Sequence, residues 1–62
     1  MTYETEKIQE WAKQLEINVK VLGGYHATNY LDHKAYFANV IIDGVNAQLM
    51  LDLMTGTVEL LD

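Results

Sequence analysis

The pair Asp43-Gly44 lies between two runs of alternating apolar residues and predicts a tight turn between two antiparallel strands. A two-residue type I′ turn needs positive φ at both central positions, which Asp and Gly tolerate. With this pair at the tip, one face of the hairpin is apolar or aromatic throughout, with the pairs Ile42–Val45, Val40–Ala47, Ala38–Leu49 and Tyr36–Leu51. A slip of one residue would move that whole set to the other face, so the pattern predicts the register.

A second turn is expected around Thr55-Gly56, followed by a final strand. Two geometries remain open. If Thr55 and Gly56 alone form the tip, Leu53 pairs with Val58. The alternative is a three-residue loop with Gly56 in the left-handed region.

The N-terminal segment predicts an amphipathic helix from about 3 to 15, with Thr2 as its N-cap. Its apolar residues recur at the spacing of one helical face: Ile8, Trp11, Ala12 and Leu15. Trp11 lies in the middle of this stripe, so we expect it to fill the centre of the core.

After the helix, alternation over about 17–22 predicts a short, half-buried strand that ends at Gly23-Gly24. The segment 25–34 fits neither a helix nor a strand well. It is either a loop or a wide hairpin whose arms extend the neighbouring strands.

These elements predict one α+β domain over residues 1–62, with the N-terminal helix packed on a three- to four-stranded antiparallel meander. The expected bounds are about 3–15 for the helix and about 17–22, 35–42, 45–53 and 57–61 for the strands.

The sheet face that the helix does not cover carries apolar side chains too. Alternation places four of them there as candidates for an interface: Phe37, Ile41, Met50 and Leu61. A 62-residue chain buries only about 60% of its unfolded surface and so has thin stability. A homodimer that covers this face, or pairs edge strands, is the expected form.

Composition excludes several partners and compartments. The net charge of −5 disfavours nucleic acid phosphates and anionic membranes, and all four basic residues are Lys, which removes the bidentate Arg reader. No apolar run approaches the roughly 20 residues of a membrane helix, and no signal peptide is visible. The chain is expected to be cytoplasmic.

The stretch Asp52 to Val58 reads D-x-x-T-G-x-V and follows an alternating strand and an Asp-Gly hairpin. In these features the chain resembles the PepSY domain over roughly its last 27 residues. The resemblance implies a small helix-plus-sheet module with a peptidase-inhibitory or interaction role. Family members mostly act outside the cytoplasm, which the visible sequence does not suggest.

Catalytic and metal-binding signals are weak. The chain contains neither Ser nor Cys, and Thr28 near His26 has no predicted geometry of a nucleophile and its base. The set His26, Asp32 and His33 has the ligand types but no convincing metal spacing. We therefore expect no enzyme activity, no catalytic or metal-binding residues and no cofactor.

A second candidate binding region is the 25–34 segment. Its Tyr and His side chains are contact residues that binding loops favour: Tyr25, His26, Tyr30 and His33. The alternative is that Tyr30 and Tyr36 close the end of a small core.

Two non-catalytic functions follow. The first is a PepSY-like protein-interaction module, expected to be homodimeric, with an unknown protein partner. The second is an acidic intracellular regulator, of the sort that mobile elements encode, which binds a basic host protein surface by charge complementarity.

Overall fold

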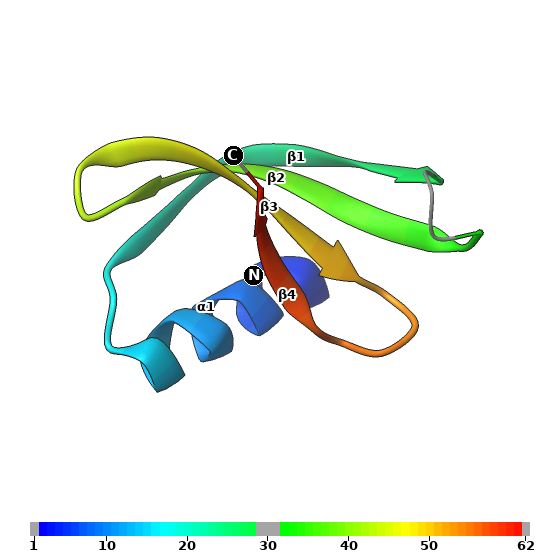
Figure 1. Cartoon of the computed structure of the whole chain (residues 1–62), viewed down its shortest axis with the longest axis horizontal. Coiled ribbons are helices and arrows are strands. Elements are labelled where there is room, and N and C mark those ends of the chain that lie inside the picture. Colours follow the sequence, from blue (N-terminus) through cyan, green and yellow to red (C-terminus); the bar gives the residue numbers. More distant parts are fainter. Residues whose placement is uncertain (1, 29–31, 62) are drawn as a thin grey trace.

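The computed structural model describes residues 2–28 and 32–61 as one helix packed against one face of a four-stranded antiparallel sheet (Figure 1). The elements are α1 (Tyr3–Leu15), β1 (Val19–Thr28), β2 (Lys34–Ile42), β3 (Val45–Asp52) and β4 (Val58–Leu61). The strands follow one another in the sheet in chain order, so β1 and β4 form its two edges. The predicted α+β meander is confirmed.

Helix α1 spans the range expected from its periodicity. The Thr2 side chain accepts a hydrogen bond from the Thr5 amide at 3.2 Å, as an N-cap does. At the other end Glu16 adopts a left-handed conformation with φ 57°, and the Ile17 amide donates to the Ala12 carbonyl at 3.0 Å. Local capping therefore sets both ends of the helix.

The β2–β3 hairpin has the predicted register, from Ile42 opposite Val45 to Ala35 opposite Asp52. Asp43 and Gly44 form its tip with φ values of 48° and 86°. Two consecutive positive φ angles are what a type I′ turn requires, which explains why this pair fixes the hairpin.

The last hairpin differs from the two-residue turn considered above. Its loop runs from 53 to 57, and β4 is displaced by two residues, so that Leu51 faces Val58. Because the displacement is even, each β4 side chain still lies on its expected face. Gly56 has φ 77°, the left-handed conformation of the alternative geometry, although the loop is longer than three residues.

Strand β1 does not end at Gly23-Gly24, and this expectation was wrong. Pairing continues to Thr28 through a β-bulge, in which Leu22 is the extra residue between Val21 and Gly23. A Cβ on Gly24 would lie 2.6 Å from the Phe37 carbonyl oxygen and from the Tyr36 ring. The glycine thus permits close approach within the strand, and the wide-hairpin interpretation of 25–34 holds for its described arms.

The main core lies between α1 and the sheet. Its buried side chains are Ile8, Ala12, Val19, Ala38, Val40 and Leu49. Ile8 is fully buried at the centre, whereas Trp11 is only partly buried at the margin. The expectation that Trp11 fills the centre was wrong, because its helical position turns it toward β4.

The opposite face of the sheet has a small core of its own, formed by Ala35, Phe37 and Met50 with Ala27 and Leu61 at its margin. The sequence predicted that Phe37 and Met50 would be exposed. They are only 8% and 3% exposed. The extra length of β1 is one reason, because it brings the Tyr25 ring into a stack on Phe37 with 5.5 Å between centroids.

Candidate functional site

The four loop candidates do not converge on one site. Tyr30 lies outside the described residues. Tyr25 stacks on Phe37, whereas the neighbouring His26 points to the opposite face and contacts α1. His33 lies immediately before β2 and contacts Asp52 at the end of β3. Each described candidate therefore has a separate structural partner.

His26 joins β1 to the first turn of the helix. Its Nε2 lies 2.7 Å from Glu4 Oε2, and its ring lies 5.0 Å from the ring of Tyr36. The imidazole, and after it the helix backbone, lower the pKa of Glu4 below its usual 4.5. This contact holds the N-terminal end of α1 against the sheet.

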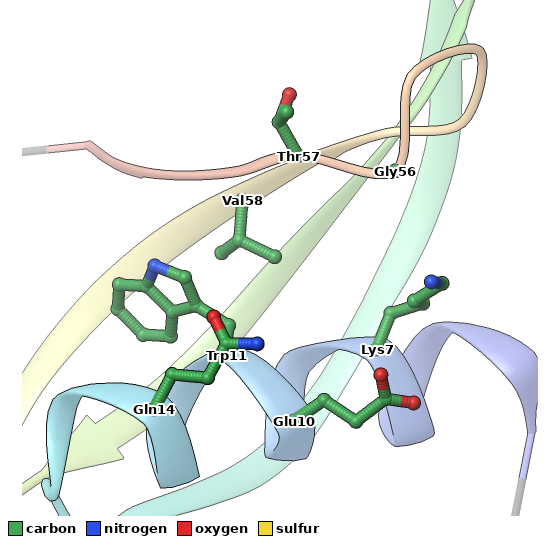
Figure 2. A pocket seen from close by; sticks show the side chains of 7 residues that line it. All are labelled: Lys7, Glu10, Trp11, Gln14, Gly56, Thr57 and Val58. Carbon is green, nitrogen blue, oxygen red and sulfur yellow. The ribbon is translucent and has the colours of Figure 1, made fainter.

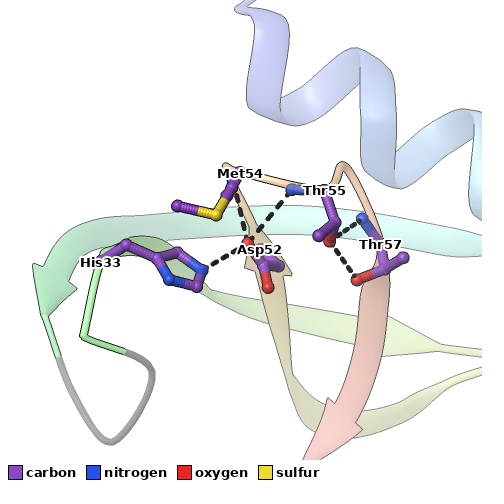
Figure 3. A network of polar contacts seen from close by, with 5 residues as sticks. All are labelled: His33, Asp52, Met54, Thr55 and Thr57. Atoms are coloured by element: carbon purple, nitrogen blue, oxygen red, sulfur yellow. Dashed lines mark hydrogen bonds and ion pairs between the residues drawn. The ribbon is translucent and has the colours of Figure 1, made fainter.

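His33 and Asp52 form the centre of a polar network at the β3–β4 loop (Figure 3). His33 Nε2 donates to Asp52 Oδ1 at 2.7 Å, because a carboxylate can only accept. The same oxygen accepts from the amides of Met54 at 2.9 Å and Thr55 at 3.3 Å. Asp52 thus caps the loop and ties it to β2.

Backbone contacts complete the loop. The Gly56 amide donates to the Asp52 carbonyl at 2.7 Å, and the Asp52 amide donates to the Thr57 carbonyl at 2.8 Å. The Thr55 and Thr57 hydroxyl groups lie 2.9 Å apart (Figure 3). The D-x-x-T-G residues therefore have an architectural role, which is to close the loop that positions β4.

Hydrogen bonding controls the charge of Asp52. Its partial burial alone would raise the pKa. The hydrogen bond from the Met54 amide, followed by those of His33 and the Thr55 amide, outweighs burial and holds the pKa of Asp52 below its usual 3.8. The carboxylate is therefore held in its ionised form, which can accept the hydrogen bonds of a cap. A general acid would instead have to carry a proton.

The histidines do not assemble a metal centre. Within 2–28 and 32–61, no three His, Cys, Asp or Glu side chains come together in a way that could hold an ion. His26 and His33 instead pair with different carboxylates. That the protein uses no cofactor stays a prediction from the sequence.

A groove of about 320 Å³ lies between α1 and the start of β4 (Figure 2). Its lining residues are Lys7, Glu10, Trp11 and Gln14 from the helix and Gly56, Thr57 and Val58 from the loop and strand. Figure 2 shows Val58 pointing from β4 toward the helix and Thr57 pointing to the other side of the strand. The helical residues follow the i, i+3, i+4, i+7 spacing of one stripe.

A second, apolar groove of about 330 Å³ lies at the other end of β4. It is lined by Ile42, Val45, Asn46, Ala47, Leu60 and Leu61. Val45 and Leu60 are 66% and 52% exposed. We call the region formed by Trp11, Val45, Val58 and Leu60 the β4 surface.

Sequence reasoning missed the β4 surface because it looked for exposed apolar residues on the other face of the sheet. The available signal was the stripe that contains Trp11, which is offset from Ile8 and Ala12 by part of a turn. Of the predicted interface residues, Leu61 alone borders this region, while Ile41 is partly buried elsewhere.

No helix within the described residues is long and apolar enough to cross a membrane. Searches of family models, curated proteins and solved structures found no match to this chain. The resemblance to the PepSY domain stays a prediction.

Proposed function

We propose that this chain is a non-catalytic module that binds another polypeptide through the β4 surface. The observation that carries the proposal is that exposed Leu60 of the edge strand β4 and exposed Val45 at the start of β3 line the same apolar groove. Exposed apolar side chains that gather beside a groove are typical of interaction sites. The histidines and Asp52 are already engaged in holding the fold.

A selection from a displayed library of random peptides tests this proposal with folded protein as the target. Leu60→Lys should abolish enrichment, because it places a charge in the apolar groove. Leu22→Lys is the matched control, since Leu22 is 55% exposed on the opposite edge strand. Failure to enrich any peptide, or enrichment that depends on Leu22 and not on Leu60, would contradict the proposal.

Self-association is a second candidate. A homodimer would cover Leu60 and Val45 and supplement the thin core of a small domain. Light scattering over a dilution series would then report a dimer that Leu60→Lys dissociates. A wild-type monomer at all concentrations would remove this candidate and leave a different protein as the partner.

The PepSY-like and acidic-regulator hypotheses are both forms of protein binding, and salt separates them. Binding driven by the net charge of −5 should weaken steeply as salt rises from low to physiological concentration. Binding driven by the apolar groove that Val45 and Leu60 line should change little with salt. A PepSY-like role would further require that the chain slow a peptidase on mixing.

A further inference from the structure

We infer that the ligand of the β4 surface is an extended segment of another protein, which adds to β4 as a further antiparallel strand and places a basic side chain beside Glu59. This inference rests on the proposed function and names the partner of that same site. It follows from the direction of the β4 backbone groups and from the charges around them.

The backbone groups of Val58 and Leu60 point away from the sheet. The Thr57 carbonyl accepts a hydrogen bond from the Asp52 amide of β3, so the backbone groups of Thr57 point toward β3. The direction of the backbone N–H and C=O groups alternates along a strand. The backbone groups of Glu59 therefore also point toward β3, whereas those of Val58 and Leu60 point to the free edge. No other strand within the described residues pairs with that edge.

The same two residues direct their side chains toward the helix side of the sheet. Val58 lies above the groove that Trp11 lines, as Figure 2 shows, and Leu60 lies beside the second groove. A strand added here would place alternate side chains next to Val58 and Leu60. Those side chains should be apolar, because they would lie over Trp11 and the apolar groove.

Charge selects the residue between them. Glu59 is exposed and projects to the other face of the sheet. In an added strand its neighbour would form a non-hydrogen-bonded pair with it, in which side chains come closest. Lys7 and Glu10 both line the groove, so the helix side is balanced in charge. A Lys or Arg beside Glu59 is therefore the complementary choice, and the net charge of −5 favours it further.

A second copy of this chain fits the edge less well. The one two-fold arrangement that pairs both Val58 and Leu60 joins Val58 of each copy to Leu60 of the other. That arrangement places Glu59 directly opposite Glu59 of the second copy, where like charges repel. Pairing of β4 with β4 of a second copy is thus disfavoured, and pairing with a strand that carries basic residues is favoured.

The rival edge is less suitable. Strand β1 carries the bulge at Leu22, and bulges distort the spacing of edge hydrogen bonds. A ligand on β4 and a ligand on β1 would therefore protect different amide protons from exchange.

The test uses a capped peptide of about eight residues, a common strand length, that alternates Val and Lys. Trp11 fluorescence measures its binding to the whole chain, and amide hydrogen exchange locates it. We expect the Val58 and Leu60 amides to exchange on the order of tenfold more slowly at saturation. Slower exchange at Val19 and Val21 of β1 instead would overturn the inference.

Backbone methylation distinguishes strand addition from simple charge attraction. In the added strand the Val residues of the peptide face β4 with their backbone groups and the Lys residues face away. N-methylation of the Val amides should therefore abolish binding, whereas N-methylation of the Lys amides should be tolerated. Equal binding of the two methylated peptides would overturn the inference.

Charge reversal tests the role of Glu59. Glu59→Lys should weaken binding of the Val-Lys peptide about two- to tenfold and improve binding of a Val-Glu peptide. Glu6→Lys is the matched control, with the same change in net charge on an exposed part of α1. Equal weakening by both variants would refute a specific contact with Glu59.

The two proposals fail separately. Library peptides that bind in a Leu60-dependent way without protecting the Val58 and Leu60 amides would refute strand addition and leave the proposed function standing. Absence of any enriched peptide would refute the proposed function itself.

Discussion

Leu49 and Leu60 lie directly opposite each other on β3 and β4, yet Leu49 is fully buried and Leu60 is 52% exposed. Both side chains point to the helix side, but α1 covers only the inner one. Leu49→Ala should cost about 2–5 kcal/mol, whereas Leu60→Ala should change stability by about 0.5 kcal/mol or less. Urea denaturation followed by circular dichroism measures both. Similar losses would mean that β4 is covered in solution.

Gly23 and Gly24 are adjacent in β1 and should respond differently to a methyl group. A Cβ on Gly24 would meet backbone and ring atoms at 2.6 Å, whereas one on Gly23 would meet nothing within 4 Å. Gly24→Ala should therefore cost about 1–3 kcal/mol through overpacking, and Gly23→Ala should be neutral or slightly stabilising. Thermal unfolding of the two variants would decide; a destabilised Gly23→Ala with an unaffected Gly24→Ala would contradict this packing.

Asp52 should make stability depend on acid pH. A carboxyl group whose pKa is lower in the folded than in the unfolded chain stabilises the fold at pH values above its unfolded pKa. For Asp52 this contribution is lost as the pH falls below the usual pKa of 3.8 and through the lower pKa of the folded state. Asp52→Ala should lower the melting temperature at pH 7, and its difference from wild type should shrink toward about pH 2. Glu59→Gln is the control, because it leaves the loop hydrogen bonds intact. A pH-independent difference would contradict the assigned cap.

His26 should hold the helix N-terminus rather than the whole fold. His26→Ala removes the 2.7 Å contact with Glu4, so amide exchange should quicken in the first turn of α1 and remain unchanged in β3. His33→Ala is the matched variant, and it should quicken exchange at Met54 and Thr55 instead. Identical exchange patterns in the two variants would show that the contacts are not local.

Met50→Lys should unfold the chain. Met50 is 3% exposed beside Phe37, so a lysine there would bury a charge among apolar groups. The loss in free energy of unfolding should be larger than that for truncation of a buried Met to Ala, which is about 2–5 kcal/mol. A folded Met50→Lys protein with a cooperative transition would show that this face opens in solution, and it would restore the predicted interface of Phe37, Ile41, Met50 and Leu61.

Much of the local structure was predictable because short-range chemistry determines it. Thr2 caps the helix through its own hydroxyl group, and Asp43-Gly44 forms a turn that few other pairs allow. Alternation along the strands then set the β2–β3 register, because a slip would exchange the buried and exposed faces. Each of these features follows from residue types at neighbouring positions, although Asp43 also exchanges hydrogen bonds with Asn18.

The last hairpin and the long first strand were less predictable because distant atoms decide them. The loop length after Asp52 follows from hydrogen bonds that Oδ1 makes with two amides and with His33, which is 19 positions earlier. Gly23-Gly24 resembles a break in sequence, but the approach of Tyr36 and Phe37 makes the second glycine part of the strand.

The sequence by itself determined one helix, an antiparallel meander and the face on which each strand residue lies, because periodicity and turn chemistry act over a few neighbouring positions. Only the tertiary structure decided which apolar residues stay exposed. The helix covers Leu49 and not Leu60, and a lengthened β1 brings Tyr25 onto Phe37. Exposure depends on how far each covering element reaches across the sheet, and that reach is set by packing between segments far apart in the chain.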